Sequence, residues 1–425
     1  DSGLRRNDGV RKMKFHTSFA GGKADKGVCM TLLTEKISTY LEKSSWIRKM
    51  FEAGIEMKQQ FGEDQVYDFS IGNPDLPPPP AVGKALQVIA ERSASSLSLG
   101  YMPNAGFPRV RELLAGSVSE EQGVAAGKDD LLLTSGAAGG LNCFFKAVLE
   151  PGDEVICPAP FFVEYTFYAD NVGARLKPVP SRPEDFHLDL EGIARTLSDK
   201  TRAVLINSPN NPTGQVYNRR ELQELSDMLR AAGSRFGRPI LLISDEPYRF
   251  LRYDQTEVPS ILPLYAHSAV ISSFSKNLAL AGERIGYILL NPEMPEKETL
   301  MNGLIFTNRI LGFVNAPTIG QQVLEFAFNA EVDVSIYEQR RQLLGDILSD
   351  AGYSFLWPKG GFYFFPRAPG GDDLAFLELL RKERILAVPG SGFGFPGCFR
   401  LSFSVPEAVI RNSRESFLRA IAANG

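Results

Sequence analysis

Lys276 is the residue of this sequence that could most directly do covalent chemistry. It ends the run Ser273-Phe274-Ser275-Lys276, and Arg284 follows eight positions later. A lysine amine forms a Schiff base with an aldehyde when burial or a neighbouring cation lowers its pKa. The serines and the arginine could bind a phosphate group. These residues therefore indicate a covalently held, phosphorylated cofactor, although a lysine beside serines can equally be a solvated surface residue.

Further polar side chains follow apolar runs that we expect to be parallel strands. Ligands bind at the carboxyl ends of the strands in an open parallel sheet, so these residues should gather in one place. The segment Asn207 to Gly214 is so rich in amides and prolines that it holds Asn211 rigidly. Another strand end, Ser244-Asp245-Glu246-Pro247-Tyr248, supplies a carboxylate and a phenol. Capping of a helix is the alternative role for Asp245.

A third strand end, Thr134 to Gly140, consists of small residues that open a helix. Its bare backbone N–H groups could bind a phosphate, or the segment could be only a tightly packed turn. Together the strand ends meet the requirements of pyridoxal 5′-phosphate. The lysine would form the Schiff base, an aspartate would keep the ring nitrogen protonated, and amide and phenol donors would hold the ring oxygen.

Short apolar runs, most of them separated by helical segments, are the elements that position these residues. This alternation predicts an α/β fold with a mainly parallel, helix-covered sheet. The expected strands are residues 131–134, 154–157, 203–207, 240–244, 269–273 and 285–290.

Both chain ends are expected to form a smaller α+β domain. Helical spacing covers residues 32–60, a strand is predicted at 66–72, and Pro77 to Pro80 indicate a boundary. A long helical stretch at 317–351 precedes strands at 362–365, 386–388 and 400–403. The predicted division is a poorly ordered basic leader at 1–29, the N-terminal part of the small domain at 30–77, a large cofactor-binding domain at 78–322, and the C-terminal part of the small domain at 323–425. Met30 could be the natural start.

The composition excludes several classes of protein. Of the 425 residues, 44% are hydrophobic and 23% charged, which is typical of a soluble globular protein. No apolar run approaches the roughly 18 residues that a membrane-spanning helix needs. A net charge of −4 with dispersed basic residues argues against nucleic-acid binding. Four cysteines without a CxxC pair and three histidines outside metal-ligand spacing indicate no metal site and favour the cytoplasm.

With these motifs in this order, the chain from about residue 40 onward resembles the class I/II aminotransferases, pyridoxal-phosphate enzymes of fold type I similar to aspartate aminotransferase. The resemblance implies that Lys276 forms the Schiff base and that Asp245 pairs with the pyridine nitrogen. It implies that Tyr248 and Asn211 donate to the ring oxygen, and that the ring stacks on Phe162, in the segment 158–165. The phosphate ligands implied by the family are Ser273, Ser275, Arg284 and the backbone of Gly136, Ala137 and Ala138.

The resemblance also implies substrate contacts and a homodimer. Arg400 and Gly72 match the residues that hold the substrate α-carboxylate, with Asn211 beside them, and a planar guanidinium suits this bidentate contact. Tyr101, in the segment 100–106, matches a tyrosine that reaches the phosphate of the other subunit. Arg309 lies near the region that supplies a distal-carboxylate arginine in dicarboxylate-specific relatives, although an exposed helix face is its more ordinary role.

The predicted function is transfer of an amino group between an α-amino acid and a 2-oxo acid, as in amino-acid biosynthesis, with Lys276 moving the α-proton. The same fold hosts lyases and decarboxylases, because the pocket decides which bond breaks. A cofactor-sensing regulator is a further alternative, but the 29-residue leader is too short for a DNA-binding module. The sequence does not identify the amino donor.

Overall fold

The computed structural model describes residues 32–43 and 54–424, so the predicted leader and Met30 lie outside the described residues. The chain divides into two units, residues 1–43 and 44–425. In the first unit the helix α1 (Glu35–Lys43) is described. In the second, residues 54–61 are helical, so the predicted helical spacing is confirmed in both places, although residues 32–34 precede the first helix.

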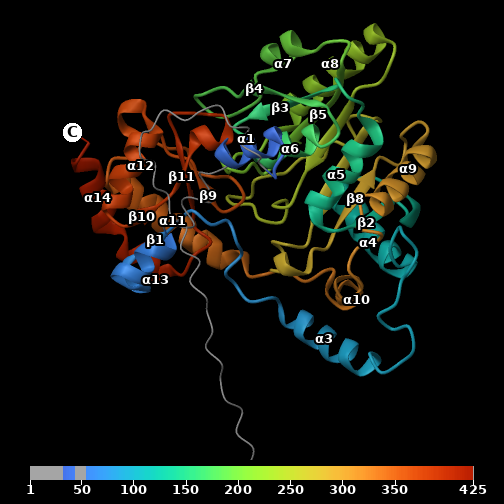
Figure 1. The fold of residues 1–425 in the computed structure, drawn as a ribbon, viewed down its shortest axis with the longest axis horizontal. Helices are drawn as coiled ribbons and strands as arrows, with labels where there is room; N and C mark the ends of the chain where they lie inside the picture. Colours follow the sequence, from blue (N-terminus) through green and yellow to red (C-terminus); the bar gives the residue numbers. More distant parts are fainter. Residues whose placement is uncertain (1–31, 44–53, 425) are drawn as a thin grey trace, which may run out of the picture. The chain divides into compact units, whose positions relative to one another are not determined.

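A seven-stranded sheet forms the centre of the second unit, in the order β2-β8-β7-β6-β5-β3-β4 (Figure 1). The strand β8 is antiparallel to both neighbours, and the other pairs in the sheet are parallel. The mainly parallel sheet is therefore confirmed. Its strands are β2 (Leu131–Thr134), β3 (Glu154–Ala159), β4 (Arg175–Pro180), β5 (Thr201–Asn207), β6 (Leu241–Asp245), β7 (Ser268–Ser273) and β8 (Gly286–Leu290).

The edge strand β4 is the strand of this sheet that the sequence does not predict. It pairs on one side only, with β3, and carries Arg175 and Lys177 among its residues. Charged residues are common on edge strands because they oppose pairing with another chain. They also interrupt the apolar run by which a strand is predicted.

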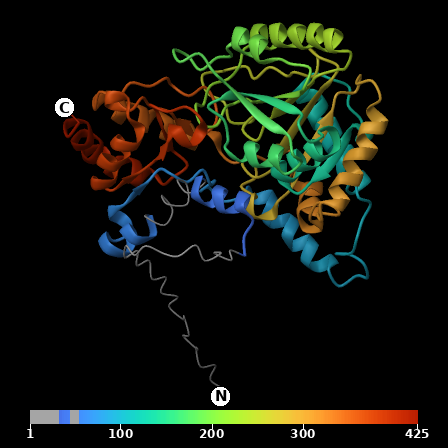
Figure 2. The same ribbon diagram turned by 45° about the horizontal axis from the view of Figure 1, so that its top comes forward.

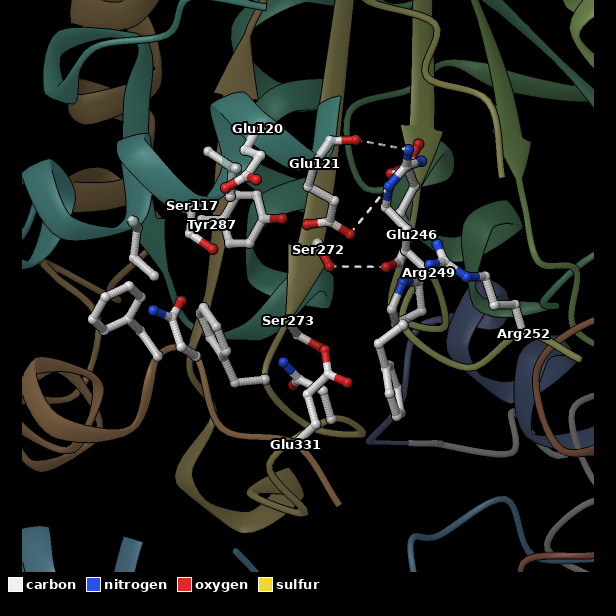
Figure 3. A pocket seen from close by; sticks show the side chains of 18 residues that line it. Ser117, Glu120, Glu121, Glu246, Arg249, Arg252, Ser272, Ser273, Tyr287 and Glu331 are labelled. Atoms are coloured by element: carbon white, nitrogen blue, oxygen red, sulfur yellow. Dashed lines mark hydrogen bonds and ion pairs between the residues drawn. The ribbon is translucent and has the colours of Figure 1, made fainter. Parts of the chain in front are cut away.

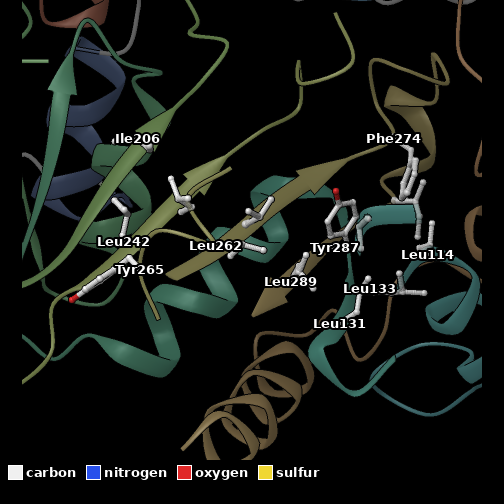
Figure 4. Close-up of a cluster of buried hydrophobic side chains, with 14 of the residues drawn as sticks. Leu114, Leu131, Leu133, Ile206, Leu242, Leu262, Tyr265, Phe274, Tyr287 and Leu289 are labelled. Carbon is white, nitrogen blue, oxygen red and sulfur yellow. The ribbon is translucent and has the colours of Figure 1, made fainter. Parts of the chain in front are cut away.

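Helices cover both faces of the sheet. Successive residues of β2 show why, since Leu131 and Leu133 belong to one hydrophobic cluster and Leu132 to another. The first cluster, part of which Figure 4 shows, includes residues of α3 (Pro80–Arg92), α4 (Pro108–Gln122), α7 (Leu190–Thr196), α8 (Arg219–Phe236) and α10 (Thr318–Ala327). The opposite cluster includes residues of α5 (Gly136–Val148), α6 (Glu164–Asp170) and α9 (Lys297–Ile310).

A smaller α+β part has its own hydrophobic core. The strands β11 (Val388–Pro389), β12 (Phe399–Ser402) and β9 (Tyr363–Phe364) form an antiparallel sheet. Around it lie helices that are labelled in Figure 1 and seen from a second direction, in orange and red, in Figure 2. These helices are α11 (Val334–Asp350), α12 (Asp373–Lys382), α13 (Glu407–Asn412) and α14 (Arg414–Ala422).

Segments from before and after the large sheet meet in this part. The strand β1 (Tyr67–Asp68) pairs in parallel with β10 (Ile385–Leu386), so the predicted strand at 66–72 is short. The helical stretch predicted at 317–351 is two helices, because residues 328–333 separate α10 from α11. The predicted boundary after residue 322 falls within α10, and the domain boundaries stay a prediction.

This topology brings the predicted site residues to one edge of the large sheet. Asn207 at the end of β5 is paired in register with Asp245 at the end of β6, and Asp245 is paired with Ile271 of β7. The loop after β7 contains Lys276. In the described ranges, no helix is both long enough and apolar enough to cross a membrane.

Candidate active site

A cavity of about 980 Å³ lies at the carboxyl ends of β5, β6 and β7. Residues from several distant segments line it, including α5, the start of α6 and β12. The structure brings together at this cavity the predicted residues Gly72, Ala137, Ala138, Phe162, Asn211, Asp245, Tyr248, Ser273, Ser275, Lys276, Arg284 and Arg400.

Lys276 is held at the wall of the cavity. Its Nζ donates a hydrogen bond to the carbonyl oxygen of Gly72 at 2.6 Å and lies 5.3 Å from the ring centre of Phe362. Burial, with smaller contributions from the charges of Arg400 and Arg284, lowers the pKa of Lys276 from 10.5 to about 7. A large share of this amine is therefore neutral near pH 7, as a nucleophile or a base must be.

Gly72 is needed for the close approach of these segments. A Cβ atom at this position would lie 2.2 Å from the hydroxyl oxygen of Tyr363, closer than any ordinary contact. Because Gly72 has no side chain, its carbonyl can face Lys276 while Tyr363 packs against its backbone.

Asp245 ends β6 with its carboxylate in the cavity. The hydroxyl of Tyr165 donates to its Oδ2 at 2.5 Å, while its Oδ1 is buried and has no hydrogen-bond partner among residues 54–424. Burial raises the pKa of Asp245 to about 7, although the bond from Tyr165 opposes the rise. The capping alternative is wrong, because the described bond to this carboxylate comes from Tyr165 and not from a helix backbone.

Tyr248 and Asn211 are fixed by bonds to other residues of the cavity. The hydroxyls of Tyr248 and Tyr363 are 2.9 Å apart, and burial raises the pKa of Tyr248 well above its usual value. The backbone N–H of Asn211 donates to Oδ1 of Asn207 at 2.7 Å. Oδ1 of Asn211 accepts a bond from Nη1 of Arg400 at 3.0 Å, which leaves the amide nitrogen of Asn211 as the donor toward a ligand.

Arg400 is a buried cation on β12. Its Nη2 donates to the carbonyl oxygen of Ser70 at 2.7 Å, and its guanidinium lies 4.5 Å from the ring centre of Tyr363. Its Nε is buried and has no partner within the described part of the chain. A buried guanidinium with a free N–H is suited to bind a carboxylate.

The N-terminus of α5 and Arg284 form the anion-binding end of the cavity. Gly136 starts this helix with a φ of +69°, and a Cβ atom there would lie 3.0 Å from Nη2 of Arg284. The first backbone N–H groups of a helix have no intrahelical partner, and the helix dipole favours an anion beside them. Ala137 and Ala138 line the cavity. Gly136 does not line it, but the guanidinium of Arg284 packs closely against Gly136 because this residue has no side chain.

Two further residues from the sequence analysis lie away from the cavity in this chain. Tyr101 is 93% exposed and is not among the described residues that line the cavity. Arg309 is exposed near the end of α9, where its guanidinium lies 5.3 Å from the ring centre of Phe306. Within one chain, Arg309 therefore lies on an exposed helix face, which is the alternative to its role as a distal-carboxylate ligand.

Several residues that line the cavity were not predicted from the sequence, and four of them bear on its chemistry. Tyr165 and Glu164 lie inside the segment 158–165 that the sequence had already marked. The spacing of three residues between Phe162 and Tyr165 could have indicated that both side chains reach the same cavity. Asn207 fixes both Asn211 and the backbone carbonyl of Asp245. Tyr363 stands in an aromatic run with no polar neighbour, so nothing in the sequence separates it from a core residue.

A second cavity, of about 370 Å³, shares Ser273 and Pro247 with the first (Figure 3). Arg249 contacts Glu246 and Glu121 there, at 3.1 Å each. These charges are paired with one another, and Ser273 is the one predicted site residue that lines it. The larger cavity is therefore the candidate active site.

The residues of the larger cavity fit a phosphorylated pyridine aldehyde. The unpartnered Oδ1 of Asp245 could accept a bond from a protonated ring nitrogen, and the amine of Lys276 could react with the aldehyde. The α5 N-terminus and Arg284 could hold the phosphate. Fold and cavity together define the pyridoxal-phosphate-dependent enzymes of fold type I.

The chain belongs to the aminotransferase class I and II family. The family model described as "Aminotransferase class I and II" matches residues 64–417. An aspartate aminotransferase of Thermotoga maritima is 33% identical over 353 residues, which are 81% of this chain and 88% of the relative. The aspartate/prephenate aminotransferase of Thermus thermophilus is 30% identical over 374 residues, 86% of this chain and 93% of the relative. The chain is thus an aminotransferase of a family that uses pyridoxal phosphate.

Solved structures agree with this assignment. An aminotransferase from Eubacterium rectale superposes with a TM-score of 0.88 at 37% identity, over 93% of this chain and 100% of that chain. Thermus thermophilus aspartate aminotransferase with maleate superposes with a TM-score of 0.80 at 27% identity, over 92% of this chain and 100% of that chain.

Proposed function

We propose that the cavity around Lys276 binds pyridoxal 5′-phosphate and is where an amino group moves between an α-amino acid and a 2-oxo acid. The observation that carries this proposal is that two groups line the same cavity. One is Lys276, whose pKa is lowered to about 7, and the other is Asp245, a buried carboxylate with an unpartnered oxygen. A buried carboxylate oxygen without a partner is costly, and a bound N–H group would satisfy Oδ1 of Asp245.

The cofactor would be held at five points. Lys276 would form the covalent link to its aldehyde, and Asp245 would accept the bond from its ring nitrogen. Tyr248 and Asn211 would donate to its ring oxygen, and Phe162 would stack on its ring. Its phosphate would contact the start of α5 at Gly136, Ala137 and Ala138, together with Ser273, Ser275 and Arg284.

When bound, the cofactor supplies a cationic ring that withdraws electrons from the substrate α-carbon. The protein supplies the proton transfer: once the amino group of the donor has displaced Lys276 from the cofactor, the free Nζ would accept the α-proton and later return a proton to the cofactor carbon beside it. Arg400 holds the substrate α-carboxylate beside Gly72 and Asn211, which orients the α-carbon toward Lys276. Asp245, paired with the ring nitrogen, would remain anionic because its partner is cationic.

A homodimer would complete the site. Aminotransferases of this family are usually dimers, and we propose that Tyr101 contacts the phosphate in the partner's cavity. The exposed segment around Tyr101 lies beside the loop after α9, because the side-chain nitrogen of Asn315 donates to the carbonyl of Met102 at 3.1 Å. This surface carries the exposed apolar side chains Leu97, Leu99, Phe306, Ile310 and Phe313. Covering them would be favourable in a dimer.

Two further expectations belong to the proposal. Residues 78–322 would form the cofactor-binding domain, with 30–77 and 323–425 as the small domain. A cytoplasmic location fits an enzyme of free amino acids and 2-oxo acids.

Reduction of the loaded enzyme tests the site assignment directly. After incubation with pyridoxal phosphate, borohydride should fix the cofactor to one peptide, which mass spectrometry should identify as the peptide containing Lys276. The Lys276→Ala variant should carry no fixed cofactor, and Lys359→Ala, which removes a half-exposed lysine outside the cavity, should be labelled like the wild type. Labelling at another lysine would overturn the assignment.

A further inference from the structure

Glu164 is a carboxylate of the cavity that the proposed function does not use. It is the first residue of α6 and lines the same cavity as Lys276 and Arg400. Its Oε2 is buried and has no hydrogen-bond partner in the described part of the chain. Among the described residues, Asp245 is the other carboxylate that lines this cavity, and the ring nitrogen would donate a hydrogen bond to its unpartnered oxygen.

The cations of the cavity do not satisfy Glu164. Lys276 donates to the carbonyl of Gly72, and Arg284 donates to the carbonyl of Ala281 at 2.8 Å. Arg400 donates to Asn211 and to the carbonyl of Ser70. Burial raises the pKa of Glu164, while its own backbone N–H and the charge of Arg400 oppose that rise. Arg400 is therefore near enough to act electrostatically on Glu164, although no hydrogen bond joins the two side chains among the described residues.

The position of Glu164 is fixed by its neighbours. The next residue, Tyr165, is buried and bonded to Asp245 at 2.5 Å, so the start of α6 is anchored at the cavity wall. Tyr168, one helical turn after Glu164, lines the cavity as well. Glu164 therefore stays beside the place where Arg400 would hold the substrate α-carboxylate, and the side chain of a bound amino acid would lie near it.

We propose that Glu164 is a specificity-determining residue that favours amino donors whose side chain ends in N–H groups, as an amide or an amine, and disfavours dicarboxylic donors. This inference rests on the proposed function of the cavity. An ionised carboxylate only accepts hydrogen bonds, so an amide or ammonium group satisfies Oε2. The side-chain carboxylate of a dicarboxylic donor would repel Glu164 and would leave its Oε2 without a hydrogen-bond donor. The proposed preference for amide or amine donors thus differs from aspartate, the donor that appears in the names of similar aminotransferases.

Matched donors of nearly the same shape test the inference. Single-turnover rates of the donor half-reaction are measured for glutamine against glutamate and for asparagine against aspartate. Wild-type enzyme should react faster with the amide in each pair, by about tenfold or more. In Glu164→Gln the amide-to-acid rate ratio should fall by about tenfold, with the loaded cofactor absorbing as in the wild type. The control Glu191→Gln, which removes an exposed carboxylate on α7, should keep the wild-type ratio.

The outcomes separate this inference from the function on which it rests. If no donor changes the cofactor spectrum of the wild type, the proposed function fails, and the inference with it. If donors react but the wild type prefers the acid in both pairs, the function stands and the inference is overturned without any variant. If Glu164→Gln slows amide and acid donors equally, Glu164 acts only by positioning Arg400, and the specificity role is also overturned.

Discussion

The hydroxyl of Tyr165 donates a hydrogen bond to Oδ2 of Asp245 at 2.5 Å and leaves Oδ1 of the same carboxylate for a ligand. This bond joins the start of α6 to the end of β6. It also stabilises the charged form of a carboxylate whose pKa burial raises to about 7. Tyr165 thus orients Asp245, the proposed partner of the ring nitrogen, and favours its ionised form.

Removing that bond should weaken the cofactor site. In Tyr165→Phe the pKa of Asp245 should rise further, because the hydrogen bond from Tyr165, which lowers this pKa, is lost. A less ionised Asp245 pairs less strongly with a cationic ring, so cofactor affinity should fall by about tenfold, equivalent to about 1.4 kcal/mol. Titration with pyridoxal phosphate measures this change. Tyr168→Phe is the matched control from the same helix, and an equal loss in both variants would contradict the special role of Tyr165.

The buried lysine should destabilise the cofactor-free enzyme. The pKa of Lys276 is about 7 in the folded chain and 10.5 as its ordinary value, so the unfolded chain binds the extra proton between these values. Stability therefore rises with pH across this window, and the destabilisation is full below pH 7 and absent above about pH 10.5. Lys276→Met should be more stable at pH 6.5 by about 1–3 kcal/mol.

Denaturant unfolding of the cofactor-free wild type and Lys276→Met, followed from pH 6.5 to pH 10, checks this prediction. The difference in unfolding free energy should shrink as the pH rises. A difference that stays constant with pH would mean that the lysine is not desolvated as the structure indicates.

Arg400 should be required for substrate binding and not for loading of the cofactor. Arg400→Lys keeps the charge but loses the planar fork that binds a carboxylate through two N–H groups. The KM for amino donors should rise by about tenfold to a hundredfold, while the absorption of the loaded cofactor stays unchanged. Steady-state kinetics at saturating cofactor measure the effect. An unchanged KM would remove Arg400 from the substrate site.

The dimer assignment predicts complementation between two defective chains. Tyr101→Ala should lower cofactor affinity although the side chain is 93% exposed in the single chain. Lys276→Ala should be inactive. Refolding the two variants together should restore activity, because one cavity of the mixed dimer then has Lys276 and the partner subunit's Tyr101. Failure of the mixture to exceed its components would exclude the shared site.

Much of the fold and the cavity could be predicted from sequence because the carboxyl ends of parallel strands meet at one edge. Asn211, Asp245 and Lys276 each follow an apolar run, and those runs are β5, β6 and β7. Tyr363 could not be found in this way, since it reaches the cavity from the separate sheet of β9, β11 and β12. Its role depends on packing against Gly72 and Tyr248, which no local pattern encodes.

Glu164 escaped prediction for a different reason. A glutamate in the first turn of a helix is ordinary, because the helix dipole favours it there. Only its buried, unpartnered Oε2 in the same cavity as Arg400 sets it apart, and that is a property of the folded chain.

The spectral half-reaction tests the central claim most directly. Enzyme loaded with pyridoxal phosphate is mixed with an amino donor, and a 2-oxo acid is then added. We predict that the donor removes the absorption of the Lys276-linked cofactor, that the 2-oxo acid restores it, and that Lys276→Ala shows neither change. Turnover of the donor without any dependence on a 2-oxo acid, or full activity of Lys276→Ala, would contradict the account.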